Sequence, residues 1–156
     1  MPDLLVKLYD LPAAGADGKE AASATVRRAF AAERRLICDW VAAEFGNGWA
    51  SECEAAFARS PVTCFLARDD YELVGFACYD ATARGMFGPL GVRTRDRKRG
   101  YGRALLLACL RDMTAQGYAY AIIGGAASTA LYQQAAGATE IAGSSPGFYR
   151  GMLKVR

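Results

Sequence analysis

Residues 97–103, with the sequence RKRGYGR, place four basic side chains and two glycines within seven positions. The wider segment from Arg93 to Arg103 holds six basic residues and one acid, Asp96, which gives it a formal charge of +5. Since the whole chain carries +3, the remainder sums to −2, and the positive charge is concentrated in this one segment. Crowded cations repel one another, and the positive end of a helix dipole repels them further. The segment is therefore predicted to bind an anion.

The elements expected around this loop favour a phosphate as the anion. An extended run at 85–92 precedes the loop, and an apolar helical pattern begins at 101. The first amides of a helix have no partner within the helix and attract anions. Gly100 and Gly102 lack a Cβ atom, which lets a phosphate approach the backbone closely. The alternative is a solvated basic surface loop that has no specific ligand.

Known phosphate-binding patterns narrow the class of ligand. The nucleotide-triphosphate pattern GxxxxGK[ST] is absent, because no Gly-Lys pair is followed by Ser or Thr. The dinucleotide pattern GxGxxG is incomplete, because Leu105 stands in place of its third glycine. That pattern also needs an acidic residue about 20 positions further on, and residues 117–127 contain none. Nucleic acid stays open as an alternative, although nucleic-acid surfaces usually spread their cations along a face and interleave aromatic residues.

The spacing Arg97-x-x-Gly100-x-Gly102 resembles the [QR]-x-x-G-x-[GA] signature of the GNAT superfamily of N-acetyltransferases, and LGV at 90–92 and LYQQAAGA at 131–138 strengthen the resemblance. The resemblance implies that acetyl-coenzyme A is the cosubstrate, with its pyrophosphate held by the loop amides and with no metal. It also implies that the pantetheine arm pairs with a strand where two parallel strands splay apart. The cofactor-binding residues implied in this way are Leu90, Val92, Arg97, Lys98, Arg99, Gly100, Tyr101, Gly102 and Arg103.

Tyr132 matches the tyrosine that many GNAT enzymes place beside the thioester sulfur, so the resemblance implies that it is the catalytic proton donor. A phenol with a pKa of about 10 can give a proton or a strong hydrogen bond to a thiolate with a pKa of about 8–9. The alternative is that the Tyr132 ring packs in the core and takes no part in chemistry.

The sequence assigns no general base, and an ordered water is one candidate. The carboxylates considered for this role lie on strands, and the alternative for each is a solvated strand end: Asp80, Glu72 and Glu140. Three aromatic residues are candidates to line the acceptor pocket or else to pack in the core: Tyr79, Phe87 and Tyr149.

The composition predicts a single compact domain over residues 1–156. Of its 156 residues, 53% are hydrophobic and 22% are charged. No apolar run approaches the ~20 residues that span a bilayer, and the first residues lack a signal-peptide pattern. The five cysteines have no CxxC spacing and the chain has no histidine, which predicts reduced thiols in a cytoplasmic protein and no metal site.

Hydropathy patterns predict how the chain positions these residues. Strands are expected at 4–9, 62–68, 72–79, 85–92, 118–125, 138–142 and about 148–154. Helices are expected at 22–45, as one or two segments, and at 49–60, 101–117 and 128–136. This order predicts an α/β, GNAT-like fold with a mixed central sheet of about seven strands flanked by helices.

Three functions compete at this stage. The first is a cytoplasmic N-acetyltransferase that transfers acetyl from acetyl-coenzyme A directly to a primary amine of a small molecule or to an exposed amino group. The second is a non-catalytic acyl-coenzyme A-binding or regulatory module on the same fold, and the third is a nucleic-acid-binding protein. The first predicts a small-molecule amine as partner, no nucleic acid and no membrane, and it is compatible with a homodimer.

Overall fold

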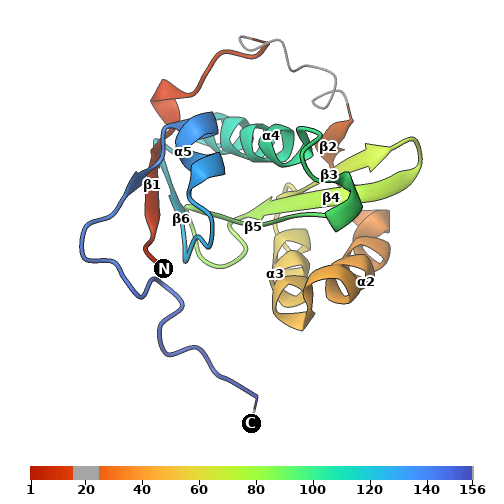
Figure 1. Cartoon of the computed structure of the whole chain (residues 1–156). Coiled ribbons are helices and arrows are strands. Elements are labelled where there is room, and N and C mark those ends of the chain that lie inside the picture. The colour runs from red at the N-terminus through yellow and green to blue at the C-terminus, as the bar shows by residue number, and fades with distance from the viewer. Residues whose placement is uncertain (16–24, 156) are drawn as a thin grey trace.

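The computed structural model describes residues 1–15 and 25–155 (Figure 1). Its strands are β1 (Leu4–Lys7), β2 (Val26–Arg28), β3 (Cys64–Asp69), β4 (Glu72–Tyr79), β5 (Met86–Val92), β6 (Tyr120–Ile123) and β7 (Thr139–Glu140). Its α-helices are α2 (Arg34–Phe45), α3 (Asn47–Phe57), α4 (Tyr101–Ala115) and α5 (Ala130–Ala136). Three 3-10 helices connect them: η1 (Leu8–Asp10), η2 (Ala31–Glu33) and η3 (Thr94–Asp96). No helix of the described residues is long and apolar enough to cross a membrane.

The strands form one mixed sheet in the order β2-β3-β4-β5-β6-β1-β7. All neighbouring pairs are antiparallel except β5 and β6, which run parallel. Helices α4 and α5 cover one face of the sheet, and α2 and α3 cover the other (Figure 1). The predicted α/β class and the mixed sheet of about seven strands are confirmed.

Each face of the sheet has its own apolar core. The apolar side of α4 is fully buried on the first face, as its periodicity predicted, and includes Leu105, Leu110 and Met113. On the second face, α2 and α3 bury Ile37 and Cys53 against the sheet. The helix predicted at 101–117 ends close to its expected stop, where Gly117 adopts a φ of +100° and donates its amide to the Thr114 carbonyl.

The helical segment predicted at 22–45 is wrong at its start. Residues 22–24 lie outside the described part, and Val26–Arg28 form the edge strand β2, in antiparallel register with β3. The helix begins only at Arg34. A long-range ion pair helps to hold β2 in the sheet, because Arg28 Nη2 lies 2.7 Å from Asp112 Oδ1 on α4. Pairing with a distant strand overrides the local helical pattern here.

The strand predicted at about 148–154 is also wrong, since residues 148–151 form turns and residues 152–154 have no regular secondary structure. The place beside β6 is taken by β1, with Leu5 opposite Ile122, and β7 lies beyond β1. The alternating side chains Leu4 and Val6 of β1 are completely buried. The sheet therefore keeps seven strands because the unpredicted β2 replaces the strand that is missing from the C-terminal end.

Candidate functional site

The basic loop joins β5 to the start of α4, as predicted. Its backbone enters the left-handed region twice, at Lys98 with a φ of +64° and at Gly100 with a φ of +88°. Gly100 is the N-cap residue of α4, and no side chain caps the helix. The helical bonding begins when the Ala104 amide donates to the Gly100 carbonyl, so the amides of Tyr101 and Gly102 precede the first bond. This open end of a 15-residue helix suits an anion.

The two glycines of the loop have different structural roles. Gly100 has a backbone conformation that L side chains rarely adopt, so the turn itself requires glycine there. Gly102 has no such need. A Cβ atom at this position would lie 3.7 Å from Leu131 Cδ2 and 3.8 Å from Val92 Cγ2, which are ordinary contacts. The fold therefore tolerates a side chain at Gly102, and the glycine leaves room over the helix start for a ligand.

Carboxylates of the protein balance part of the loop's positive charge. The Asp96 side chain is only 7% exposed, and its two oxygens bind Arg93 Nε at 2.5 Å and Arg99 Nη1 at 3.1 Å. Glu72 on β4 binds Arg93 Nη1 at 2.6 Å and Arg95 Nη2 at 2.8 Å. These hydrogen bonds with Arg93 hold the pKa of Asp96 and of Glu72 below their usual values. These two carboxylates thus balance two of the three arginine charges without a bound anion.

Arg97 and Lys98 keep their charge available to a ligand. Both are exposed, and no carboxylate of the described residues lies within ion-pair distance of either one. Arg97 Nε donates to the Val92 carbonyl at 3.1 Å, which fixes this side chain beside the end of β5. The uncompensated charge lies at the junction of β5 and the loop.

An unpaired strand edge leads away from this junction. The parallel pairing of β5 with β6 includes only Met86 with Ile122 and Phe87 with Ile123, although β5 continues to Val92. Within the described residues, the edge from Gly88 to Val92 has no strand partner on the side of β6, while β4 pairs with its other side. Leu90 and Val92 both lie on this stretch. The structure thus places these two residues where the resemblance expects the strands to diverge.

Tyr132 lies at the other end of the same edge. Its ring meets the Phe87 ring edge-on with 6.2 Å between centroids, and Phe87 is the last residue of β5 that pairs with β6. Burial raises the pKa of the Tyr132 hydroxyl, which keeps it protonated. This hydroxyl makes no hydrogen bond to any described residue. Every fully buried side-chain oxygen in the described part of the chain has a hydrogen-bond partner, so the Tyr132 hydroxyl is not fully buried. The ring is packed in the core while the hydroxyl remains accessible.

One protein-family model matches most of this chain. The model of the acetyltransferase (GNAT) family matches residues 34–138, which include α2, the basic loop and Tyr132. The chain belongs to the GNAT acetyltransferase family. Membership of this family implies acetyl transfer with coenzyme A. None of the curated proteins compared with the chain matches it.

Solved structures share the fold of this GNAT chain at low sequence identity. A glucosamine N-acetyltransferase region of a fungal multi-domain GH3 β-N-acetylglucosaminidase has a TM-score of 0.70 and 12% identity over 90% of this chain and 19% of that one. A GCN5-related N-acetyltransferase from Sphaerobacter thermophilus has a TM-score of 0.68 and 21% identity over 90% and 48% of the two chains. The Escherichia coli GNAT family N-acetyltransferase YhbS, in complex with CoA, has a TM-score of 0.53 and 18% identity over 70% and 65%. The chain spans less than half the length of the first two.

The other carboxylates and aromatic residues singled out from the sequence have structural partners or lie at the surface. Asp80 accepts the Gly85 amide at 2.7 Å and the Tyr118 hydroxyl at 2.6 Å, so it ties the turn between β4 and β5. Tyr79 is buried and donates its hydroxyl to Asp112. Glu140 is exposed on β7.

The C-terminal tail of the GNAT chain makes contacts that sequence analysis did not identify. Asp3 Oδ1 accepts the amides of Gly125 at 2.9 Å and Phe148 at 3.0 Å. The Tyr149 ring lies against Gly124 and Gly125, where a Cβ atom would come within 3.5 Å and 3.3 Å of it. The pair Gly124 and Gly125 after β6 was the sequence signal for this packing, because two residues without side chains leave room for a ring on the backbone.

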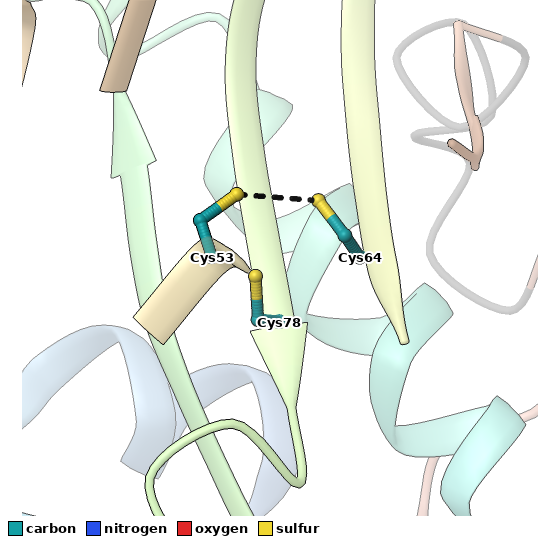
Figure 2. A group of neighbouring side chains, drawn as sticks. All are labelled: Cys53, Cys64 and Cys78. Atoms are coloured by element: carbon teal, nitrogen blue, oxygen red, sulfur yellow. Dashed lines mark hydrogen bonds between the residues drawn. The ribbon is translucent and has the colours of Figure 1, made fainter. Parts of the chain in front are cut away.

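Three cysteines meet in the core between α3 and the sheet (Figure 2). Cys53, Cys64 and Cys78 are completely buried, and their sulfur atoms lie within 4.8 Å of one another. Their sequence spacing gave no sign of this cluster. Burial raises the pKa of the Cys78 thiol well above its ordinary value, and the Cys64 contact and burial raise that of Cys53 to about 12. The hydrogen bond with Cys53 lowers the pKa of the Cys64 thiol. Cys53 and Cys78 are thus protonated and pack as small hydrophobic groups among the apolar side chains of this core.

Proposed function

We propose that this GNAT protein transfers the acetyl group of acetyl-coenzyme A to a primary amine of a small molecule or to an exposed amino group. The unpaired edge of β5 carries the proposal. It connects the basic loop, beside Val92, with the Tyr132 ring, beside Phe87. Four residue steps of extended strand separate Gly88 from Val92, a span of ~13 Å. An extended arm held along this edge has its phosphates at one end and its thioester near the other.

The chemical step assigned to this site is direct attack by the amine. The neutral amine nitrogen forms a bond to the acetyl carbon while the carbon–sulfur bond breaks. The nitrogen loses one proton on becoming an amide, and the departing thiolate gains one. Tyr132 supplies a hydrogen bond or a proton to that sulfur, and its raised pKa keeps the phenol in the protonated state that this role requires. By the family resemblance, the backbone amide near Leu90 faces the acetyl oxygen.

Two further observations support the proposed cofactor site. Gly102 leaves the space over the helix start open although the fold accepts a side chain there, which fits a closely bound ligand. Arg97 and Lys98 keep positive charge beside the open helix end, which suits the charge of a diphosphate. Three structural neighbours are named N-acetyltransferases, and one of them is a complex with CoA, which supports an amine acceptor and this cosubstrate.

The test has a binding arm and a turnover arm. Calorimetry with acetyl-coenzyme A should show binding by the folded protein, and a thiol-release assay with a panel of primary amines should show amine-dependent release of coenzyme A. Binding without turnover would replace the enzyme with the non-catalytic acyl-coenzyme A module. Salt-sensitive binding of DNA in competition with coenzyme A would favour the nucleic-acid alternative instead.

A further inference from the structure

Two hydroxyl side chains from separate segments donate to one carboxylate oxygen of Glu52. Glu52 lies on α3, Thr82 in the loop between β4 and β5, and Tyr149 in the C-terminal tail. Thr82 Oγ1 donates to Glu52 Oε1 at 2.5 Å, and Tyr149 Oη donates to the same oxygen at 2.7 Å. The two hydroxyl oxygens are 2.9 Å apart. These contacts fix the position of a carboxylate that the sequence did not single out.

The charge of Glu52 has no counter-ion within the described residues. No lysine or arginine among them lies within 4.0 Å of its carboxylate, and its second oxygen, Oε2, accepts no hydrogen bond from them. The side chain is nevertheless partly buried. A partly buried carboxylate with two hydroxyl donors and no cation is suited to bind a cationic ligand at its remaining oxygen.

This carboxylate lies close to the point where β5 and β6 part. Its donor Tyr149 packs its ring on Gly124 and Gly125, which directly follow Ile123, the last residue of β6. Ile123 is also the last β6 residue that pairs with β5. Glu52 belongs to α3 on one face of the sheet, whereas Tyr132 belongs to α5 on the other (Figure 1). Groups on the two helices can therefore reach the diverging strands from opposite sides.

An aromatic side chain precedes Glu52 by one helical turn. Trp49 is 38% exposed, and its ring lies 5.1 Å from the Phe45 ring and 6.2 Å from the Phe76 ring. Residues three apart on a helix share a side, so α3 presents an aromatic surface next to a carboxylate. That combination matches an ammonium group attached to an apolar body.

We propose that Glu52 binds the ammonium group of the acetyl acceptor, with Thr82 and Tyr149 orienting the Glu52 carboxylate and Trp49 contacting the apolar part of the acceptor. The bound ammonium gives its extra proton to solvent before the neutral amine nitrogen attacks the thioester. The acceptor class is then a primary amine on an apolar or aromatic body. This inference rests on the proposed function for its site. Burial raises the pKa of Tyr149 to about 12, so this hydroxyl stays a donor to Glu52 at neutral pH.

The test uses the full chain saturated with coenzyme A and 2-phenylethylamine as the probe. Glu52→Gln is the decisive variant, because the amide oxygen still accepts from Thr82 and Tyr149 while the negative charge is lost. Glu54→Gln is the matched control, since it removes the same charge from an exposed position on the same helix. Calorimetry should show binding by wild type and Glu54→Gln, and about ten- to hundredfold weaker binding by Glu52→Gln. The uncharged 2-phenylethanol should not distinguish wild type from Glu52→Gln.

Different outcomes would overturn the role of Glu52 and the proposed catalytic function. Equal affinity of wild type and Glu52→Gln for the amine, or no binding of the amine by wild type, overturns the role of Glu52 while coenzyme A binding stands. If the amine binds through Glu52 but no amine is acetylated, the Glu52 amine site stands and the proposed catalytic function fails. A structural role for Glu52 alone predicts that Glu52→Gln leaves amine affinity unchanged.

Discussion

The Tyr132 ring lies edge-on to the Phe87 ring, and Phe87 marks the point at which β5 loses β6 as its partner. One aromatic pair thus sets a candidate proton donor at the start of the open strand edge. The packing of the ring and the accessibility of the hydroxyl are separable, because the contact with Phe87 involves no oxygen.

Replacing Tyr132 with phenylalanine tests the hydroxyl while keeping the ring. We expect kcat for amine acetylation to fall by about a hundredfold, because the departing thiolate loses its proton donor. The KM for acetyl-coenzyme A and the unfolding temperature should change little. Steady-state kinetics and thermal unfolding measure these quantities. An unchanged kcat would exclude Tyr132 from the mechanism and leave it as a core residue.

Gly102→Glu tests whether the helix start binds coenzyme A. The new Cβ atom meets only ordinary contacts in the protein, and a carboxylate suits the first turn of a helix, so stability should be retained. Coenzyme A affinity should fall by at least about tenfold, because the added side chain occupies the space beside the loop amides and its charge repels the phosphates. Gly48→Glu is the control, since it places the same side chain in the first turn of α3, where a Cβ atom has nothing within 4 Å. Equal coenzyme A affinity of the two variants would contradict the loop assignment.

Lys98→Gly separates charge from backbone conformation. Glycine adopts the positive φ of this position without strain, so the variant should unfold at the same temperature as wild type or higher. Loss of an uncompensated cation should weaken coenzyme A binding by about fivefold at low salt, and by less as salt is added. Titrations at several salt concentrations measure this. An affinity difference that does not depend on salt would show that Lys98 does not act through its charge.

Asp96→Asn should change how stability depends on pH. Arg93 holds the folded pKa of Asp96 below the usual 3.8, so the carboxylate stabilises the fold above that value. This contribution is lost as the pH falls through the lower, folded pKa. The variant should thus unfold at a lower temperature than wild type near pH 6, and the gap should narrow by about pH 3. A gap that stays constant over this range would mean that the carboxylate charge contributes no stability.

Leu4→Ala tests the placement of β1 between β6 and β7. Leu4 is completely buried, so its truncation should lower the free energy of unfolding by about 2–5 kcal/mol. Leu153→Ala makes the same change at a side chain that is 93% exposed, and should cost less than about 0.5 kcal/mol. Chemical denaturation of both variants measures the difference. Similar values for the two would contradict the position of β1 in the sheet.

The basic loop shows how far local sequence information reaches. The +5 charge, the glycine spacing and the apolar periodicity after residue 101 are properties of neighbouring residues, and they predicted a strand, a turn and a helix start that the structure contains. They did not predict that Asp96 and Glu72 form ion pairs with three of the arginines. Glu72 lies more than twenty residues away, on a strand whose register alone brings it to Arg93.

By itself, the sequence determined the α/β class, the family signature, the helix that begins at 101 and the glycine spacing of the loop before it, because periodicity and backbone preference act over a few residues. Only the tertiary structure decided that β1 takes the place beside β6, that Val26–Arg28 form a strand, and that Glu52, Thr82 and Tyr149 meet. Strand partners and polar contacts between distant residues depend on which buried arrangement of the whole chain has the lowest free energy. No window of neighbouring residues contains that information.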